Sequence, residues 1–503
     1  MLLSRYNLKN VHNKKVITPN EALFDLPEKV LQFGTGVLLR GLPDYFIDKA
    51  NRQGVFNGRI VVVKSTSSGG SDAFDKQDGL YTLCVRGYEN GVKVEEDIVC
   101  SAISRVLSAS SEWAAVLECA HNPLMQVIIS NTTEVGIQLV NEDIRKHPPV
   151  SYPGKLLAFL YERYLAFDGS QQSGMVIVPT ELINNNARRL ESIVLELAHL
   201  NALDEKFIEW LENCNHFCNS LVDRIVPGAN KEVAAEMEKK IGLKDELLIV
   251  SEVYRLWAIE GNQHVADVLS FARADDGVVI TDDITLFKEL KLRLLNATHT
   301  LTCGVAYLSG LDTVKKAMDD GIFSQFLSDL MMQEIATAIP YEVPLLQAED
   351  FGSKVLDRFR NPFIEHHWLS ITMNYSQKMK ARAIPVLLKY WEKYNTVPEN
   401  FATCLAAYLL FMKPVKQEGE KYYGIFEERE YFINDEKAPY FYELWKKYDS
   451  AKLVHKVLSD IDMWDTNLSK INGLELEVTE KLNMMISEGL PAVLQTKKVL
   501  QEK

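Results

Sequence analysis

Apolar residues in the first half of the chain fall in short unbroken runs that end in polar or glycine-rich turns. Runs of this kind are typical of parallel strands that are buried on both faces. We predict strands at residues 29–33, 59–63, 125–129, 175–178, 247–250 and 277–280. Apolar and polar residues alternate from Tyr81 to Val99 around Asn90-Gly91, which predicts a β-hairpin inserted into this α/β unit.

After residue 280 the apolar residues recur with a helical period, and strand-like runs become rare. The pattern predicts helices at residues 284–311, 324–338, 348–358, 384–394, 401–412 and 440–450. We therefore predict a Rossmann-like domain over residues 1–282 and a mainly α-helical substrate domain over residues 283–503. A boundary between two such domains is a favoured place for a ligand site.

The first predicted strand runs directly into the glycine turn Gly34-Thr35-Gly36, and a helical pattern follows. Strand, glycine turn and helix form the entry of a nucleotide-binding unit, because glycines let the backbone approach a pyrophosphate. Only two of the three fingerprint glycines are present, since Leu39 stands in the third position. A plain strand–helix turn explains the pattern about as well. Arg40, one turn into the helix, faces either a phosphate or solvent.

Polar residues also follow the next strands. Ser65 and Thr66 come after the second strand, where an acidic residue that would hold the adenosine ribose is absent. These residues alone do not decide between NAD and NADP. Asn131 follows the third strand, and the carboxyl ends of strands are where open α/β sheets bind ligands.

Three polar residues lie on the long predicted helix at residues 284–311. At 100° per residue, Lys291, Asn296 and His299 fall within an arc of about 140°. Such a set predicts a site in which the lysine, its pKa lowered by burial, acts as a base. The asparagine donates to a substrate oxygen, and the histidine orients or donates. The alternative is a core helix whose lysine reaches outward and whose other two side chains are bonded internally.

Composition excludes several classes of partner. The chain has 503 residues, 47% of them hydrophobic, and a formal net charge of −14. This acidity argues against nucleic acid and acidic membranes as partners. No apolar run reaches the roughly 18 residues of a membrane span, and no signal-peptide core follows the N-terminus. We expect a cytoplasmic protein in which an anionic substrate would need a local cluster of cations.

Metal-binding patterns are weak. The seven cysteines are scattered, which predicts reduced thiols. Cys214 and Cys218 form the one close pair and lack a second ligand pair at zinc spacing. The run Glu365-His366-His367 also predicts surface rather than a metal site, because adjacent histidines point to different sides of a helix. We expect no metal.

Four motifs carry a resemblance to a known family. They are Gly34-x-Gly36-x-x-x-Arg40, Asp223-Arg-Ile-Val-Pro227, Lys291-x4-Asn296-x2-His299 and Arg358-Phe-x-Asn361-Pro362. In this order they resemble the mannitol dehydrogenase (long-chain polyol dehydrogenase) family over residues 27–490. The segments Asp72–Gly87 and Pro179–Ile183 are more similar to family members acting on sugar acids of uronate breakdown than to mannitol or mannonate dehydrogenases.

The resemblance implies a zinc-independent NAD(H) oxidoreductase that interconverts D-altronate and D-tagaturonate in hexuronate catabolism. Its partner would be this small-molecule substrate, and the oligomeric state stays open, although monomers are common in the family. Lys291 would be the general acid/base, Asn296 with Asn186 would polarise the reacting oxygen, and His299 and Asp223 would contact substrate. The residues matching cofactor positions are Gly34, Thr35, Gly36, Arg40, Ser65, Thr66 and Asn131.

The chain departs from the polyol members at Leu38, where they commonly carry an aromatic residue, and at two further positions. Lys288 stands where they carry a glutamate, and Ser370 stands where they carry an arginine, while the pocket lysine Lys378 is retained. Candidates for binding a substrate carboxylate are Arg358, Arg360, Lys378, Lys380 and Arg382, of which we select Lys378. Alternative functions are a mannonate/fructuronate or mannitol-type polyol dehydrogenase and, from another class, a non-catalytic dinucleotide-binding sensor. The intact lysine, asparagine and histidine disfavour the sensor.

Overall fold

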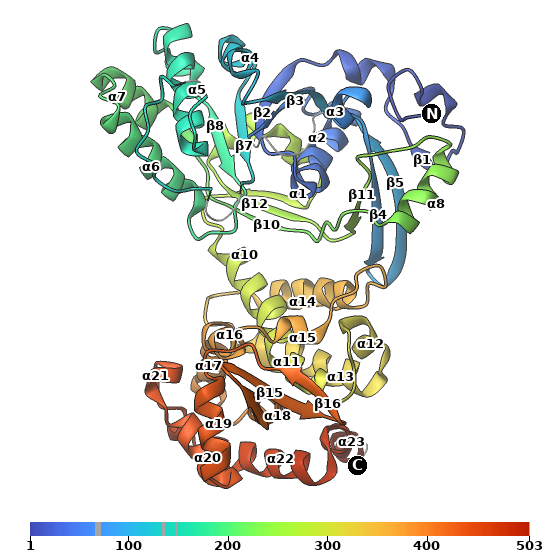
Figure 1. Ribbon diagram of the computed structural model, residues 1–503, viewed down its shortest axis with the longest axis vertical. Coiled ribbons are helices and arrows are strands. Elements are labelled where there is room, and N and C mark those ends of the chain that lie inside the picture. The colour runs from blue at the N-terminus through green and yellow to red at the C-terminus, as the bar shows by residue number, and fades with distance from the viewer. Residues whose placement is uncertain (66–71, 133–135, 147, 502–503) are drawn as a thin grey trace. The chain divides into compact units, whose positions relative to one another are not determined.

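The computed structural model describes residues 1–65, 72–132, 136–146 and 148–501. The chain divides into two compact units (Figure 1). Unit 1 comprises Met1–Arg86 and Lys93–Ile284, and unit 2 comprises Gly87–Val92 and Thr285–Lys503.

The main sheet of unit 1 is parallel and has six strands in the order β6-β3-β2-β7-β8-β9. Their bounds are β2 (Glu28–Phe33), β3 (Arg59–Lys64), β6 (Ile103–Ser108), β7 (Val127–Ser130), β8 (Val176–Pro179) and β9 (His216–Phe217). Within this sheet, the chain passes first through the central β2 and then outward through β3 to β6. It then returns to β7, next to β2, and continues outward on the other side through β8 to β9. The carboxyl ends of β2 and β7 are therefore neighbours at the point where the strand order reverses, which is where such sheets bind ligands.

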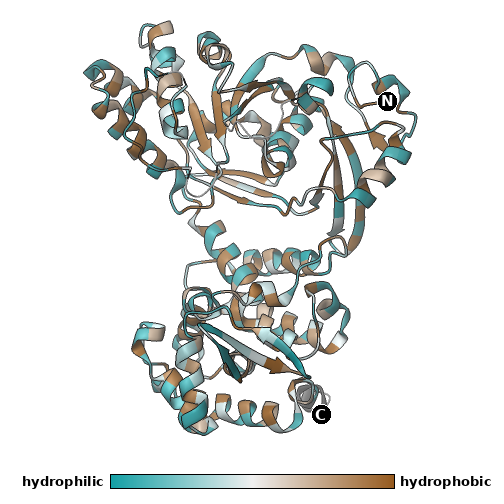
Figure 2. Cartoon of the chain, in the orientation of Figure 1, coloured by the Kyte–Doolittle hydropathy of each residue, from teal (hydrophilic) through white to brown (hydrophobic). Residues whose placement is uncertain are grey.

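Side chains of the main sheet pack on both faces. On β2, Val30 belongs to the core under one face, while Leu31 and Phe33 belong to the core under the other. The first core is covered by α1 (Val37–Gly41) and α2 (Pro43–Arg52). The second is covered by α4 (Trp113–Glu118), α5 (Tyr152–Ala166), α6 (Asn186–Leu200) and α7 (Glu205–Cys214). Burial on both faces explains the unbroken apolar runs, which appear as hydrophobic strands in Figure 2. The predicted fold class of this half is confirmed.

Two smaller sheets complete unit 1. One has the order β1-β5-β4-β11 and contains the predicted hairpin, β4 (Tyr81–Glu89) and β5 (Val92–Cys100), with β1 (Val16–Ile17) and β11 (Ile249–Glu252) outside it. Asn90 and Gly91 both have positive φ, as a tight two-residue turn requires. The other sheet joins β10 (Ser220–Asp223), β12 (Leu256–Glu260) and β13 (Val278–Thr281). The predicted strands near residues 247 and 277 thus form, but they lie outside the main sheet.

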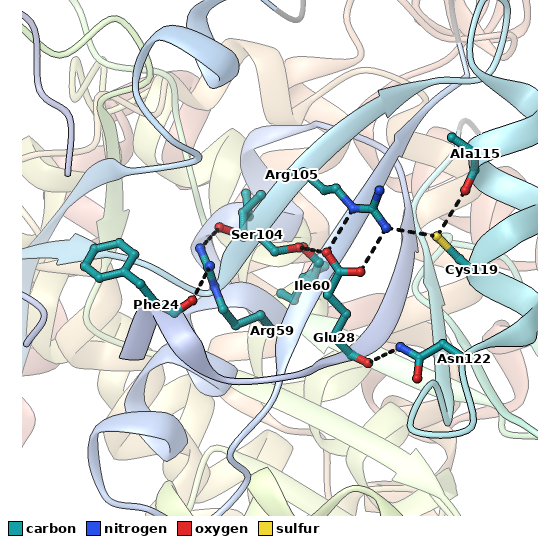
Figure 3. A network of polar contacts seen from close by, with 10 residues as sticks. Phe24, Glu28, Arg59, Ile60, Ser104, Arg105, Ala115, Cys119 and Asn122 are labelled. Atoms are coloured by element: carbon teal, nitrogen blue, oxygen red, sulfur yellow. Dashed lines mark hydrogen bonds and ion pairs between the residues drawn. The ribbon is translucent and has the colours of Figure 1, made fainter. Parts of the chain in front are cut away.

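Polar contacts fix the amino ends of three neighbouring strands of the main sheet (Figure 3). The Arg59 guanidinium donates to the carbonyl oxygen of Phe24 at 3.0 Å and to that of Ile103 at 2.5 Å. The Glu28 carboxylate accepts two hydrogen bonds from Arg105, each 2.9 Å long. The starts of β2, β3 and β6 are therefore held together by the protein itself, and the carboxyl ends carry the ligand-binding candidates.

Unit 2 is mainly helical, as predicted. The helices that concern the site are α10 (Thr285–Leu290), α11 (Thr298–Tyr307), α14 (Leu345–Phe359), α15 (Trp368–Ile371), α16 (Tyr375–Lys378), α17 (Ile384–Tyr394) and α18 (Glu399–Phe411). The buried helices α11 and α18 pack against each other. A three-stranded antiparallel sheet, β14 (Lys416–Glu418), β15 (Lys421–Phe426) and β16 (Arg429–Phe432), was not predicted. Its strands are short and largely exposed, so they show little hydrophobic pattern.

The described part of unit 2 contains three π-helical segments, which have i→i+5 hydrogen bonds. They are η6 (Lys291–Ala297), η7 (Leu330–Ile335) and η9 (Met379–Ala383). Both η7 and η9 contact η6. The helix that the sequence predicts as one α-helix at residues 284–311 is therefore α10, then η6, then α11. Single π-helical turns inside helices are frequent at functional sites.

Candidate active site

Lys291 and Asn296 lie on the π-helix η6, and His299 lies in the first turn of α11. All three are half-buried, whereas Leu294 and Leu295 between them are buried in the core. In an α-helix, residues five apart lie about 140° from each other around the axis. The wider turn of a π-helix brings such residues onto the same face. The backbone therefore aligns Lys291 with Asn296 better than the α-helical spacing predicts.

The His299 ring is enclosed by other rings. It stacks on Phe359 with centroids 4.2 Å apart, and it meets His366 and Trp368 edge-on at 5.2 and 5.8 Å. Its Nε2 atom is buried and has no hydrogen-bond partner among the described residues. A buried polar atom without a partner is uncommon in proteins, so this atom is a candidate to bind a ligand hydroxyl.

Electrostatics keep the His299 imidazole neutral. Burial is the largest cause that holds its pKa well below the ordinary value, and the charges of His366, Arg358 and Arg382 act in the same direction. Burial likewise lowers the pKa of His366, helped by His367 and Lys378. The sequence placed His366 in a surface run. The structure instead brings its ring against His299, through a contact between α11 and the segment before α15 that sequence spacing does not reveal.

Two cations act on this pair of histidines, Arg382 on His299 and Lys378 on His366. The Lys378 ammonium is half-buried and donates to the carbonyl oxygen of Ile371 at 3.1 Å. Burial lowers its pKa, and the neighbouring charge of Arg382 lowers it further. The half-buried Arg382 guanidinium donates through Nη1 to the hydroxyl of Thr300 at 3.2 Å.

The other candidate cations are already engaged. Arg360 lies 3.6 Å from the Asp357 carboxylate, and Lys380 lies 2.8 Å from that of Asp465. Arg358 is buried and interacts with other groups of the protein. Lys378 and Arg382 are therefore the candidates best placed to meet an anion.

In unit 1, Gly34 and Asn131 meet where the strand order of the main sheet reverses. Gly34 has φ of +129°, and a Cβ there would lie 2.9 Å from Cδ1 of Leu39 and 3.0 Å from the carbonyl oxygen of Asn131. The Asn131 amide donates to the Thr180 hydroxyl at 2.9 Å. Gly36 is exposed, and a Cβ there would meet nothing within 4 Å. This turn is thus closed toward the protein at Gly34 and open toward solvent at Gly36.

Other residues that the sequence assigns to the cofactor fall near this turn or outside the description. Thr35 is half-buried between the two glycines. The Ser65 hydroxyl, directly after β3, is buried and has no hydrogen-bond partner among the described residues. Thr66 lies outside the described residues. The open glycine turn and the unpartnered Ser65 hydroxyl fit the phosphates and hydroxyls of a dinucleotide.

Arg40 faces neither a phosphate nor solvent. Its side chain is buried, donates to the carbonyl oxygen of Leu247 and lies over the Tyr81 ring, 5.4 Å from the centroid. The helix also breaks at Leu42, because Pro43 lacks an N–H and disfavours a helical residue before it. We therefore leave Arg40 out of the cofactor site that we propose.

Asn186 and Asp223 are both buried in unit 1. The Asn186 amide donates to the carbonyl oxygens of Pro179 at 3.0 Å, Glu181 at 3.1 Å and Ser220 at 3.1 Å. Its Oδ1 accepts from the Ser220 N–H at 3.0 Å. The side chain therefore ties β8 to β10, with its hydrogen-bonding capacity used. Asp223 ends β10 and has contacts within the protein.

Within the described residues, no group of three or more His, Cys, Asp or Glu side chains is placed to hold a metal ion. The seven cysteines are free thiols. No helix in the described part of the chain has the length and apolar content that crossing a membrane requires.

Comparisons with known proteins cover nearly the whole chain. Residues 28–272 match the mannitol dehydrogenase Rossmann domain, and residues 283–486 match the mannitol dehydrogenase C-terminal domain. An altronate oxidoreductase of Bacillus subtilis (strain 168) is 37% identical over 473 residues, which cover 93% of this chain and 95% of that protein. One from Cronobacter sakazakii is 36% identical over 471 residues, covering 92% and 95%.

Two solved structures have a similar fold. The Pseudomonas fluorescens mannitol 2-dehydrogenase, solved as a ternary complex with NAD and D-mannitol, has a TM-score of 0.66 at 21% identity and full coverage of both chains. A D-sorbitol dehydrogenase in substrate-free form has a TM-score of 0.76 at 19% identity, covering 98% of this chain and all of that chain.

Proposed function

The chain belongs to the mannitol dehydrogenase family, and we propose that it is an NAD-dependent oxidoreductase that interconverts D-altronate and D-tagaturonate. The named relatives that match more than 90% of the chain support this substrate pair, because they are altronate oxidoreductases. The structural observation that carries the proposal is the alignment of Lys291 with Asn296 on one π-helix, directly before a neutral histidine.

Lys291 moves the proton. In the oxidation of altronate, its amine takes the proton of the reacting hydroxyl, and in the reduction its ammonium returns that proton to the carbonyl oxygen. Asn296, one π-helical turn further on, donates a hydrogen bond to the same oxygen and stabilises the negative charge that develops there. His299 contributes its unpartnered Nε2 to a neighbouring substrate hydroxyl and, being neutral, adds no charge.

The cofactor is held by unit 1. Bound NAD supplies the hydride acceptor, and NADH supplies the donor. Gly34 and Gly36 let the backbone approach the pyrophosphate, while Ser65 and Asn131 offer polar groups at the ends of β3 and β7. Substrate residues come from unit 2, where Lys378 provides a half-buried cation. The buried contacts of Asn186 and Asp223 give these two residues a supporting part in our proposal.

The experiment that tests this proposal compares the rates of NADH oxidation with D-tagaturonate, D-fructuronate and D-fructose. We expect a clear preference for tagaturonate. A preference for fructuronate would assign the chain to mannonate oxidation, and a preference for fructose would assign it to a neutral polyol. Binding of NADH without turnover of any of the three would favour the non-catalytic sensor.

We also propose a cellular location and a partner for the enzyme. Relatives named for a metabolic conversion of a sugar acid support a cytoplasmic enzyme whose partner is a small molecule. The oligomeric state stays open, and light scattering on the purified chain measures it directly.

A further inference from the structure

Arg382 lies on η9, and the helix that carries Asn296 and His299 holds it from two directions. The buried Arg293 of η6 donates to the carbonyl oxygens of Ala381 and Arg382 at 2.9 and 2.8 Å, which fixes the η9 backbone. Arg293 itself is held by the Glu289 carboxylate at 2.9 Å. The position of Arg382 is therefore coupled to the segment that bears the candidate catalytic residues.

The Arg382 side chain reaches back to the same helix. Its Nη1 donates to the hydroxyl of Thr300, the residue after His299, and that hydroxyl in turn donates to the carbonyl oxygen of Asn296 at 2.8 Å. Thr300 lies four residues beyond Asn296, a rise of roughly 6 Å along a helix. A six-carbon chain can bridge such a spacing. The guanidinium thus lies next to the candidate active site and within reach of a group on the same substrate.

The charge of Arg382 lacks a counter-ion in the described part of the chain. Among the described residues, neither Arg382 nor Lys378 forms an ion pair with a carboxylate. The acid whose charge acts on Lys378 is Asp435, whose carboxylate already accepts from the Ser376 N–H and hydroxyl at 2.7 and 2.8 Å. A guanidinium has five N–H donors, and one bond to a side chain leaves most of them available. Two half-buried cations without a counter-ion form a site for an anion.

We propose that Arg382 binds the carboxylate of the sugar-acid substrate and so sets the preference for an acid over a neutral polyol, an inference that rests on the function proposed above. The planar guanidinium matches a carboxylate with two parallel hydrogen bonds, which a lysine does not provide. Lys378 adds a second positive charge. The anion also compensates the positive charge of Arg382, which acts on both His299 and Lys378.

The test measures the affinity of the enzyme–NADH complex for D-altronate and for D-altritol, its counterpart without the carboxylate, by calorimetry. NADH cannot oxidise altronate, so binding is measured without turnover. For Arg382→Met we expect the Kd of altronate to rise about 100-fold and the Kd of altritol to change less than about threefold. Arg382→Lys keeps the charge and is expected to recover part of the loss.

Lys380→Met is the matched control, because Lys380 lies on the same helical segment but pairs with Asp465 at 2.8 Å. It is expected to bind both ligands as the wild type does. An unchanged altronate Kd in Arg382→Met, or a parallel loss of altronate and altritol binding, would overturn the inference. Failure of the proposed function is seen separately, as a wild-type enzyme that does not turn over tagaturonate with NADH.

Discussion

Replacing Asp44 by asparagine is expected to change how the stability of the protein depends on pH. Asp44 lies in the first turn of α2 and has no solvent exposure. Its Oδ2 accepts from the Gln32 amide at 3.4 Å, while its Oδ1 and the Gln32 Oε1 have no partner among the described residues. Burial raises the pKa of this carboxyl from 3.8 to about 8, against the smaller opposing effects of Gln32 and Arg40. The carboxyl is therefore largely protonated at neutral pH and has a proton to share with Gln32.

The magnitude follows from the two pKa values. Because the pKa is higher in the folded state than in the unfolded chain, the folded state binds this proton more tightly. The stability that the proton confers is complete below about pH 4 and is lost as the pH rises through about 8. At about 1.4 kcal/mol for each pH unit, the whole difference is roughly 6 kcal/mol. Between pH 5 and pH 8 the wild type should lose about 4 kcal/mol relative to Asp44→Asn, whose amide does not titrate.

Unfolding in guanidinium chloride across this pH range measures the difference in free energy of unfolding between the two proteins. The control is Asp48→Asn, one turn later on α2, which removes the 2.6 Å ion pair between Asp48 and Arg52. This variant should have a lower free energy of unfolding and should not show the pH-dependent gain over the wild type that is expected for Asp44→Asn. If the free energies of unfolding of the wild type and Asp44→Asn changed with pH in parallel, the burial argument would be refuted. Asp44 is also linked to the glycine turn proposed for the cofactor, because the Gln32 amide that bonds Asp44 also donates to the Gly34 carbonyl oxygen at 3.4 Å.

Three further predictions concern the site. Lys291→Ala should lower turnover about 10³-fold or more while NADH affinity, measured by fluorescence, stays nearly intact, and equal loss of both would contradict the acid/base role. Gly34→Ala should weaken NADH binding and lower the free energy of unfolding by about 1–3 kcal/mol. The reason is that a Cβ at φ +129° would lie 3.0 Å from the Asn131 carbonyl oxygen. Calorimetry measures the binding, and thermal unfolding measures the stability. The His299 imidazole should stay neutral in nitrogen NMR at a pH at which an ordinary histidine is protonated, because burial holds its pKa well below the ordinary value. Protonation near the ordinary value would show that the ring is not desolvated as described.

The sequence predicted best those features of the fold that depend on the burial of a whole strand or helix. Strands such as β3 and β7 are apolar along their length because both faces are covered, so the runs alone predicted a parallel α/β sheet. The strand order was not predictable from those runs, since it depends on which neighbours pair across the sheet. The sheet β14–β16 was missed because its exposed strands follow no buried pattern.

Single side chains were harder to predict, because their roles depend on contacts between distant segments. Arg40 and Asn186 occupy positions that match cofactor and substrate residues of the family, yet both donate to backbone carbonyl oxygens in the interior. His366 seemed to belong to a surface run, and its contact with His299 joins segments 67 positions apart. Periodicity says which face of a helix is apolar, and it says nothing about which loop will cover that face.

The spacing between Lys291 and Asn296 illustrates the same limit within one helix. Five residues place two side chains on different sides of an α-helix, so periodicity alone favoured an ordinary core helix over a site. The π-helical backbone removes that objection, but its hydrogen bonding is rare in isolation and persists where packing requires it. Here η7 and η9 contact η6, and Arg293 bonds η6 to η9. The geometry that aligns the lysine with the asparagine is therefore a property of the packed helices, and the same packing places Arg382 beside them.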